Sequence, residues 1–228
     1  MSQIVGITAR CIQSGGIANE ERDCLSHDWW DLLSRLGVTP LLIPNRLPSP
    51  AHFLNSTGIT HILLSSGNNL QPLPGETVNF GDYYPQRDQI EMELLSIAQK
   101  KGIPVFGVCR GLQMINRFFG GGISRNLSER LGKPKPHVTD SHPVKILTPE
   151  IKQLIGSTLD VNSYHDQGIT RDQVALPLEI FAISDDDIVE GAYHPDLPIL
   201  AIMWHPERPN KAADQTYKLM EWWLNFYN

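Results

Sequence analysis

Apolar positions in the first half of the chain alternate between two periods. Four short apolar runs are typical of buried strands, at residues 3–8, 39–43, 61–64 and 104–108. Longer segments with apolar residues at helical spacing predict helices, at residues 20–36, 87–101 and 112–119. Strands that alternate with helices predict an α/β fold in which a mostly parallel central sheet has helices on both faces.

The second half has a different pattern. Short strand-like runs at residues 144–147, 158–161, 179–184 and 188–193 are separated by turn residues, which predicts a small antiparallel element. The apolar run 199–204 returns to the sheet, and residues 211–226 predict a terminal helix. Because we find no repeat, low-complexity segment or linker, we expect residues 1–228 to form one domain. Residues 71–85 predict a long loop, either functional or a disordered insertion.

Composition narrows the class of protein. The chain has 228 residues, of which 41% are hydrophobic, and a formal net charge of −6. This charge argues against nucleic acid and against an anionic membrane as the main partner. Three cysteines suit a reducing compartment, and we find neither a signal peptide nor an apolar run long enough to span a membrane. A cytoplasmic protein is therefore expected. Cys24 is expected in the core and Cys11 in a loop.

The first candidate for chemistry is a cysteine between two glycines. Gly107-Val108-Cys109-Arg110-Gly111 follows an apolar strand and precedes a helical pattern. This is the cysteine form of a nucleophile elbow, in which a tight, strained turn exposes the thiol at the start of a helix. The N–H groups and the partial positive charge of that helix end lower the pKa of a thiol.

A cysteine nucleophile needs a base and a group that orients the base. The strand at residues 199–204 ends in His205-Pro206-Glu207, so His205 is delivered to the same sheet edge as Cys109. A turn at Pro206 can bring Glu207 back to the imidazole. A lone histidine would be interpreted as an ordinary loop residue, but its combination with a cysteine elbow favours a Cys109, His205 and Glu207 triad.

These segments carry a family resemblance. Residues 106–113 together with Trp204-His205-Pro206-Glu207 resemble the class I glutamine amidotransferase-like superfamily, a flavodoxin-type fold. Within it the chain resembles the γ-glutamyl-γ-aminobutyrate hydrolase branch, whose members cleave γ-glutamyl amides of small amines. Arg87-Asp88 and residues 162–168 support this, since the latter resemble the branch motif Asn-Ser-x-His-His-Gln. Residues 6–10, residues 20–23 and Trp29 also resemble γ-glutamyl-CDP-amidate hydrolases of capsule phosphoramidate synthesis.

The resemblance implies further site residues. Backbone N–H groups of Gly67 or Asn68, together with that of Arg110, are implied to be candidate oxyanion donors, with an ordinary strand-to-loop turn at Ser65–Gly67 as the alternative. Gln113 is implied to touch the glutamyl group, with a helix-surface glutamine as the alternative. Polar contacts to the α-amino and α-carboxylate groups are implied for four adjacent residues: Asn162, Ser163, Tyr164 and His165. Glu190 is implied to reach the α-amino group, with a solvated strand-end glutamate as the alternative.

Two departures affect what the resemblance implies. Asp166 stands where the branch motif has its second histidine, which puts a contact to the leaving amine in doubt. The segment after the third strand has one glycine where the family is rich in glycine. The amine is expected against residues 14–19, 71–85 and 133–142. His137 and His142 show no metal spacing and no partnering cysteine, so neither a metal nor a cofactor is expected.

The resemblance implies a γ-glutamyl hydrolase that works through a glutamyl thioester and releases glutamate and an amine. Alternatives are a γ-glutamyl-CDP-amidate hydrolase and a glutaminase subunit that delivers ammonia to a synthase partner. An inactive scaffold is disfavoured because Cys109, His205 and Glu207 are all present. The expected partner is a small-molecule γ-glutamyl substrate, and a homodimer is left open.

Overall fold

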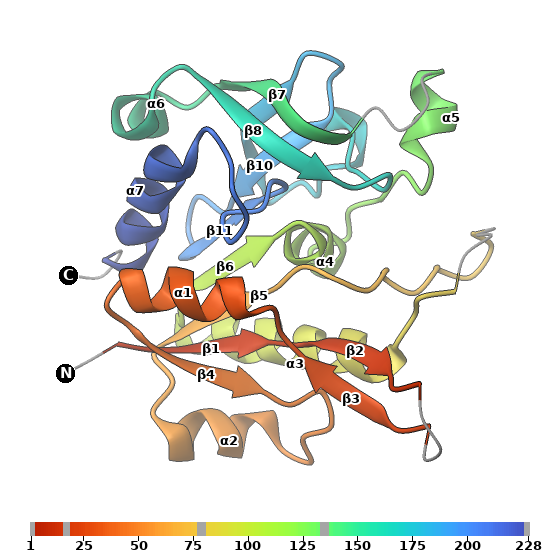
Figure 1. Cartoon of the computed structure of the whole chain (residues 1–228), viewed down its shortest axis with the longest axis vertical. Helices are drawn as coiled ribbons and strands as arrows, with labels where there is room; N and C mark the ends of the chain where they lie inside the picture. Colours follow the sequence, from red (N-terminus) through yellow and green to blue (C-terminus); the bar gives the residue numbers. More distant parts are fainter. Residues whose placement is uncertain (1–2, 16–18, 77–80, 133–136, 226–228) are drawn as a thin grey trace.

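The computed structural model describes residues 3–15, 19–76, 81–132 and 137–225. A nine-stranded sheet runs through the molecule in the order β4-β1-β5-β6-β11-β10-β9-β7-β8 (Figure 1). Its strands are β1 (Ile4–Thr8), β4 (Thr39–Ile43), β5 (His61–Leu64), β6 (Val105–Val108), β7 (Val138–Ile146), β8 (Thr158–Tyr164), β9 (Glu179–Ser184), β10 (Val189–Tyr193) and β11 (Ile199–Ile202). A separate hairpin pairs β2 (Arg10–Gln13) with β3 (Glu21–Cys24).

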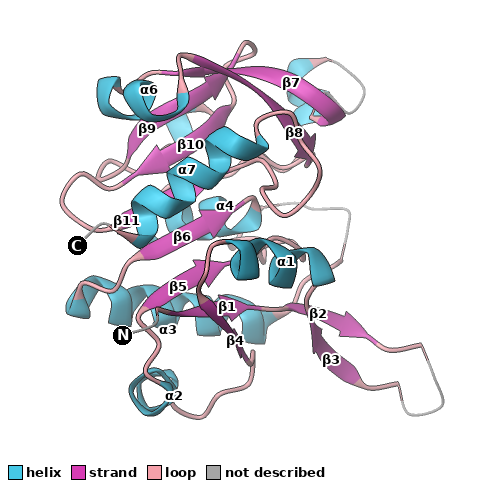
Figure 2. Ribbon diagram, turned by 60° about the vertical axis from the view of Figure 1, so that its left-hand side comes forward, coloured by secondary structure: helices cyan, strands magenta, loops and turns pink. Residues whose placement is uncertain are grey.

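Helices cover both faces of the sheet (Figure 2). The structure has α1 (His27–Arg35), α2 (Pro50–Thr57), α3 (Pro85–Lys101), α4 (Arg110–Phe118), α5 (Leu127–Leu131), α6 (Pro149–Ile155), η1 (Arg171–Gln173) and α7 (Ala213–Leu224). α3 packs between α2 and α4, whereas α7 packs against α6 and contacts α1 through a hydrogen bond from Tyr217 Oη to the carbonyl oxygen of Arg35. The predicted α/β fold is confirmed.

The two halves of the sheet differ in strand direction. β4, β1, β5, β6 and β11 are parallel to one another, and all residues of β5, β6 and β11 are buried. From β11 onward, β10, β9, β7 and β8 pair in antiparallel fashion. The antiparallel part thus contains the four strands that the sequence predicts, but β7 starts before and β8 ends after the predicted apolar runs.

The predicted helix at residues 20–36 is only partly correct. Glu21–Cys24 forms β3, and the helix α1 starts later, after the N-cap Ser26, whose side chain accepts a hydrogen bond from the N–H of Asp28. Trp29 and Leu33 are buried as the helical spacing predicts. Pairing with β2 therefore overrides the helical pattern at its charged beginning. The same hairpin buries Cys11 and leaves Cys24 half-buried, which reverses the two expectations for these cysteines.

Three short helices, α2, α5 and α6, have no counterpart among the predicted elements. Two of them begin with a proline in the first turn, Pro50 of α2 and Pro149 of α6, and follow a serine or threonine N-cap. Among the described helices, none is both long and apolar enough to cross a membrane.

Candidate active site

Cys109 occupies a strained turn between β6 and α4. Its backbone angles are φ 53° and ψ −100°, in a region that side chains rarely adopt. A Cβ atom on Gly107 would lie 2.7 Å from Ile115 Cδ1, and one on Gly111 would lie 2.3 Å from the carbonyl oxygen of Leu64. Both glycines are therefore required for this turn, which holds the thiol at the beginning of α4.

Three neighbouring parallel strands end at the same edge of the sheet. β5 leads into residues 65–68, β6 leads into Cys109, and β11 leads into residues 203–207. The register pairs Val108 of β6 with Ile202 of β11, and the N–H of Cys109 donates to the carbonyl oxygen of Ile202 at 2.8 Å. Ligand sites of α/β proteins form at the carboxyl ends of such strands.

His205 and Glu207 form a buried hydrogen-bonded pair. His205 Nδ1 lies 2.8 Å from Glu207 Oε1, and the two side chains are 3% and 2% exposed. Burial acts to lower the pKa of His205, but the neighbouring Cys109 thiol and Glu207 carboxylate raise it to about 9. The other ring nitrogen, Nε2, is buried and has no hydrogen-bond partner among the described residues. A thiol, an imidazole and a carboxylate in this order can carry out acyl transfer.

Two side chains that were expected to contact substrate are bound to backbone instead. Asn162 Oδ1 accepts from the N–H of His205 at 2.8 Å, and Asn162 Nδ2 donates to the carbonyl oxygens of His205 at 3.0 Å and Pro209 at 3.2 Å. Ser163 Oγ donates to the carbonyl oxygen of His137 at 2.7 Å. Both residues are fully buried. The geometry therefore does not support their expected substrate contact, and Asn162 fixes the backbone of His205.

Tyr164 and His165 are placed differently, because both line the cavity beside Cys109. The Tyr164 ring packs edge-on against His205 with ring centroids 5.5 Å apart. The Arg208 guanidinium lies 4.6 Å from the centroid of the Tyr164 ring, a cation–π distance. These contacts form one wall of the site.

The segment after β5 is held by a buried arginine. Arg87 Nη2 donates to the carbonyl oxygens of Ser65 and Ser66 at 2.8 Å and 2.9 Å, and Nη1 donates to Asn68 Oδ1 at 3.1 Å. Within the described ranges, the backbone N–H groups of Gly67 and Asn68 make no hydrogen bond. They are therefore free to stabilise negative charge on a substrate oxygen.

Arg87 belongs to a buried network of charges beneath this segment. Arg87 Nε donates to Glu91 Oε1 at 3.0 Å, Thr8 Oγ1 donates to the same carboxylate at 2.9 Å, and Arg110 pairs with Glu91 and Asp88. Burial acts to raise the pKa of Glu91, but Arg110 and Arg87 lower it below its ordinary value. The Arg110 side chain is thus committed to the network, while its backbone N–H, at the start of α4, has no acceptor among the described residues.

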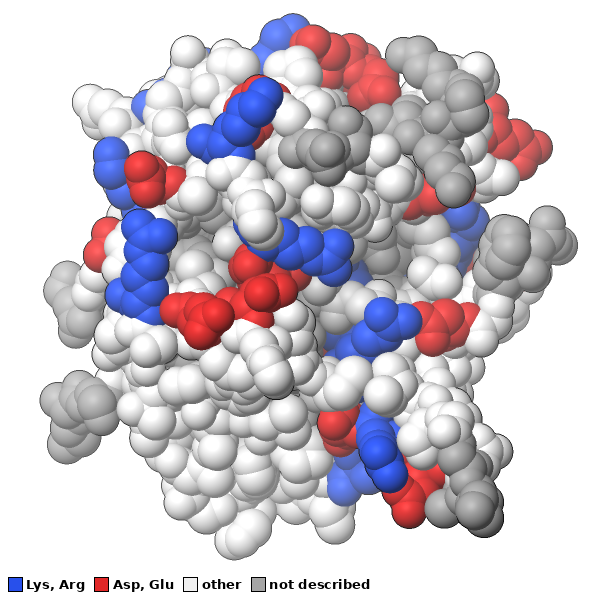
Figure 3. Space-filling view, viewed as in Figure 1, with Lys and Arg blue, Asp and Glu red and all other residues white. Residues whose placement is uncertain are grey.

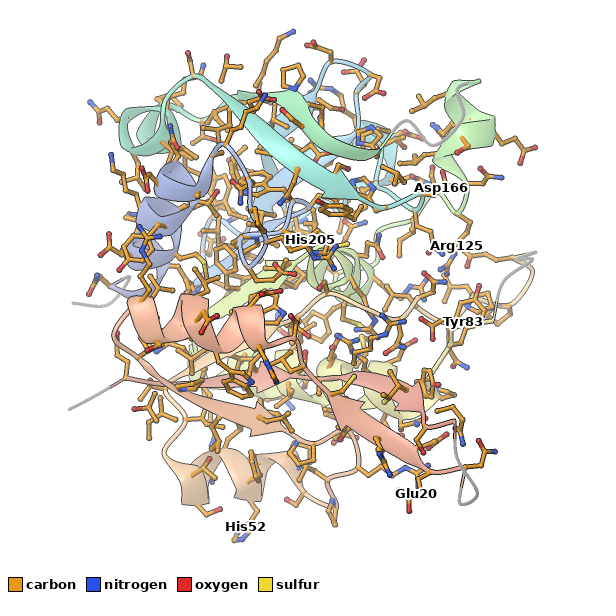
Figure 4. The ribbon with its side chains drawn as sticks, viewed as in Figure 1. Glu20, His52, Tyr83, Arg125, Asp166 and His205 are labelled. Carbon is orange, nitrogen blue, oxygen red and sulfur yellow. The ribbon has the colours of Figure 1, made fainter. Side chains whose placement is uncertain are left out.

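A cavity of about 350 Å³ opens beside Cys109. This lies in the lower part of the range of roughly 300–1,000 Å³ that small-molecule sites occupy. Gln113 lines it, and its Nε2 donates to the carbonyl oxygen of Gln167 at 2.9 Å. Three further lining residues, Tyr83, Arg125 and Asp166, lie to one side of His205 in Figure 4. On the face shown in Figure 3, basic and acidic side chains are interspersed.

Asp166, at the position of the motif's second histidine, accepts hydrogen bonds from α5. Its Oδ1 accepts from the N–H and the hydroxyl of Ser128 at 2.9 Å and 2.7 Å, which anchors α5 beside the cavity. Parts of the three loops expected to contact the amine, residues 16–18, 77–80 and 133–136, lie outside the described residues.

Glu190 lies outside the cavity lining and is fully buried in β10. Its Oε1 lies 3.3 Å from His137 Nδ1, 3.8 Å from His142 Nε2 and 3.7 Å from His165 Nε2. Burial acts to raise the pKa of Glu190, but His137 and His165 lower it to about 2. The expected contact between Glu190 and the substrate α-amino group is therefore not supported by its position.

Sequence reasoning missed the roles of Arg87 and Asn162. A signal for Arg87 exists, since Arg87 and Glu91 are four residues apart and lie beside Ile90 and Leu94 on the apolar face of α3. No local signal reveals that Asn162 binds the backbone of a residue on a distant strand.

Comparison with known proteins agrees with this geometry. The family model described as Peptidase C26 matches residues 3–207. A Schizosaccharomyces pombe protein that carries a provisional glutamine amidotransferase name is 34% identical over 88% of this chain and 81% of its own. The γ-glutamyl-γ-aminobutyrate hydrolase of Escherichia coli O157:H7 is 31% identical over 80% of this chain and 78% of its own. The γ-glutamyl-CDP-amidate hydrolase of Campylobacter jejuni is 27% identical over 96% of both chains.

Solved structures show the same fold at low sequence identity. The glutaminase domain of Trypanosoma brucei CTPS, with bound acivicin, has a TM-score of 0.68 at 15% identity, and the match covers 100% of this chain and 95% of that chain. A glutamine amidotransferase from Thermotoga maritima has a TM-score of 0.61 at 14% identity and covers 100% of this chain and 86% of that chain.

Proposed function

Because the chain belongs to the Peptidase C26 family of class I glutamine amidotransferase-like proteins, we propose that it is a γ-glutamyl hydrolase with Cys109 as nucleophile. Membership makes the chain a cysteine-type hydrolase that acts on C–N bonds. The proposed substrate is a γ-glutamyl amide of a small molecule, and the products are glutamate and an amine. The strained Cys109 turn, whose thiol acts on the pKa of His205, together with the His205–Glu207 pair, is the observation that supports this proposal.

In the proposed reaction, the Cys109 thiolate attacks the γ-carbonyl carbon and forms a tetrahedral intermediate. His205 donates a proton to the leaving amine nitrogen as the C–N bond breaks, which leaves a glutamyl thioester. Water then attacks the thioester carbon, His205 accepts its proton, and glutamate is released with the thiolate restored. Glu207 orients His205 and stabilises its protonated form through the 2.8 Å contact at Nδ1.

The proposed oxyanion donors are the backbone N–H groups of Arg110 and of Gly67 or Asn68. Arg110 is the residue after the nucleophile, where a nucleophile elbow supplies a donor. The Arg87 contacts to the segment after β5 support a fixed orientation of the other donor. Such preorganised donors stabilise the developing oxyanion without reorganisation during the reaction.

The proposed substrate contacts are Gln113 and Tyr164, and His165 lines the same cavity. We expect Gln113 to contact the glutamyl group, because it lies one helical turn after Cys109. Its Nε2 is engaged with Gln167, so its amide oxygen is the atom proposed to accept from the substrate α-amino group.

A second candidate is γ-glutamyl-CDP-amidate hydrolysis. It is favoured by the C. jejuni relative, which matches this chain over 96% of both lengths. A third candidate, a glutaminase subunit that passes ammonia to a synthase partner, is supported by the likeness in fold to the CTPS glutaminase domain. A hydrolase would turn over γ-glutamyl amines alone, whereas a glutaminase subunit would prefer glutamine and idle without its partner.

We further propose that residues 1–228 act as one domain, since the nine strands form one continuous sheet. A reducing compartment such as the cytoplasm is proposed because all three cysteines are free thiols, and because the reaction requires a reduced Cys109.

The test is a panel of γ-glutamyl amides that includes simple amines, polyamines, glutamine and a nucleotide amidate, with glutamate release as the readout. Cys109→Ala is expected to abolish turnover while the circular dichroism spectrum stays unchanged, and His205→Asn is expected to be nearly as damaging. Residual activity of Cys109→Ala within about tenfold of the wild type, a loss below about 1.4 kcal/mol in transition-state stabilisation, would contradict the assignment.

A further inference from the structure

Four side chains in or next to three strands of the antiparallel half converge on one point, three of them buried and His142 partly buried. His137 and His142 come from the beginning and middle of the β7 region, His165 follows β8, and Glu190 lies in β10. Their side chains are 2%, 14%, 3% and 0% exposed. The three imidazoles all face Glu190 Oε1, at 3.3 Å, 3.8 Å and 3.7 Å.

The carboxylate at the centre of this cluster lacks hydrogen bonds. Within the described part of the chain, neither oxygen of Glu190 has a hydrogen-bond partner, and its ion-pair partners are the three imidazoles. Distances of 3.7 Å and 3.8 Å are too long for hydrogen bonds. A buried carboxylate that is left without hydrogen bonds or a cation is unfavourable, so the arrangement requires a positive charge close to Glu190, supplied either by a protonated imidazole or by a bound cation.

The outer nitrogens of two imidazoles are already engaged. His165 Nδ1 lies 3.1 Å from the carbonyl oxygen of Gln167, to which it can only donate, and His137 Nε2 lies 3.2 Å from Asp186 Oδ1. With its proton on Nδ1, a neutral His165 directs the lone pair of Nε2 at the Glu190 carboxylate. An imidazole that donates outward to a carbonyl or carboxylate and directs a lone pair inward is the usual arrangement of a metal ligand.

We propose that this cluster is a zinc site, with His137 Nδ1, His142 Nε2 and a Glu190 carboxylate oxygen as ligands and His165 Nε2 as the fourth. The ligand atoms of the first three all lie within 4.8 Å of one another. A tetrahedral ion with bonds of about 2.0–2.1 Å separates its ligands by roughly 3.3–3.4 Å. The observed distances of 3.3 Å, 3.7 Å and 3.8 Å from Glu190 Oε1 are close to this separation. His165 Nε2 lies outside the set of three, so it would have to move toward the two other imidazoles to bind the same ion.

The backbone is locally adapted to this convergence. The pairing of β10 with β9 shifts register between Val189 and Gly191, so Glu190 is the extra residue of a bulge. The pairing of β7 with β8 shifts register between Thr139 and His142. Bulges redirect side chains, and here they accompany two of the proposed ligands. The sequence expectation of no metal rested on the local spacing of His137 and His142, which could not include a ligand from β10.

Four protein ligands without an open position are typical of a structural ion. The ion would tie His137 and β7 to β10 and to the end of β8. That end carries His165, which lines the cavity, and Tyr164, which packs on His205. The proposed role is therefore to hold this wall of the candidate active site, independently of which γ-glutamyl amide is cleaved.

The first experiment measures the metal content of the purified protein by inductively coupled plasma mass spectrometry. The protein is expressed in medium supplemented with Zn²⁺ and dialysed extensively before the measurement. We expect close to one zinc per chain. After removal of the ion with a chelator, added Co²⁺ is expected to give the visible absorption of a tetrahedral nitrogen and oxygen site. We also expect Zn²⁺ to raise the thermal unfolding temperature of the chelated protein by several degrees.

Variants locate the ion. His142→Asn and Glu190→Gln are expected to lose the bound zinc and the Co²⁺ spectrum, whereas His52→Asn, on the exposed surface of α2, keeps both (Figure 4). Cys109→Ala is also expected to keep them, because binding at the Cys109–His205 pair would instead disappear in that variant and would overturn the proposal. If the variants fail to fold, the chelated wild type decides: absence of bound zinc, of a tetrahedral Co²⁺ spectrum and of thermal stabilisation would show that the cluster holds protons only.

Discussion

The side-chain amide of Asn162 binds both backbone polar groups of His205. Its Oδ1 accepts from the N–H of His205 at 2.8 Å, and its Nδ2 donates to the carbonyl oxygen at 3.0 Å. These bonds connect β8 to the segment after β11, which lies on the other side of β10, β9 and β7 in the sheet order. The proposed base is therefore positioned by a residue that has no contact with the cavity.

Replacement of Asn162 by Asp tests this positioning. The carboxylate keeps an acceptor for the N–H of His205 but loses the donor to the carbonyl oxygens of His205 and Pro209. Leaving buried acceptors unpaired costs about 1–3 kcal/mol, so we expect kcat to fall about tenfold to a hundredfold with little change in KM. Steady-state kinetics check this, with Asn55→Asp on the surface of α2 as the matched control. A rise in KM alone would return Asn162 to the role of a substrate contact.

The substitution Arg87→Lys tests whether this site needs only the positive charge of the buried arginine or also the several N–H donors of its guanidinium group. Lysine keeps a positive charge beside Glu91 but cannot bind the carbonyl oxygens of Ser65 and Ser66 together. Since loss of one oxyanion donor costs about a hundredfold to a thousandfold in kcat, we expect its misalignment to cost roughly tenfold to a hundredfold. Kinetics and thermal unfolding should be measured together, with the exposed Arg46→Lys as control. Unchanged kcat in a folded variant would show that Arg87 serves stability alone.

The central strands of the parallel half were predictable because their residues are buried on both faces, as in β5, β6 and β11. His61–Leu64 therefore appears as an apolar run with the predicted bounds. Thr39–Ile43, at the edge of the sheet, is only partly buried but also has the predicted bounds. The segment Glu21–Cys24 was not predictable, because its strand exists only through pairing with β2, and its exposed charges suit a helix equally well. Short helices such as α2 carry too few residues for a periodic pattern.

The candidate active site divides in the same way. Cys109, His205 and Glu207 stand in local motifs at strand ends, so the order of strands in the sheet is enough to bring them together. The contacts of Asn162 and Glu190 depend on bulges and on the register of the antiparallel half, which no local pattern encodes. The expectation that Asn162 and Glu190 contact the substrate came from family resemblance. In the structure, Asn162 instead binds the backbone of His205 and Glu190 faces His137.

The pH dependence of turnover should follow His205. Its pKa is raised to about 9 because the Cys109 thiol and the Glu207 carboxylate outweigh the effect of burial. Since the protonated imidazole is the proposed acid for the leaving amine, kcat/KM should fall as the pH rises through about 9. Glu207→Gln removes one cause of the raised pKa, so the alkaline limb should move to lower pH. The check is the pH profile of kcat/KM for both proteins, with the exposed Glu221→Gln as control. A shift toward higher pH would contradict the proposed pairing.

The last prediction concerns specificity, which should be strict for the glutamyl half and loose for the amine half. The glutamyl group is expected to lie near Gln113, which is 4% exposed, so a substrate that lacks the α-amino group leaves a buried polar partner unpaired. Each such loss costs about 1–3 kcal/mol, which predicts that α-glutamyl and shorter analogues fall by tenfold or more in kcat/KM. The amine leaves through the opening of the cavity beside Tyr83 and Arg125, where water replaces lost contacts. γ-Glutamyl amides of different amines should therefore differ by less than about tenfold in kcat/KM, measured by glutamate release. A nucleotide amidate cleaved far faster than every simple amine would refute this expectation and favour γ-glutamyl-CDP-amidate as the substrate.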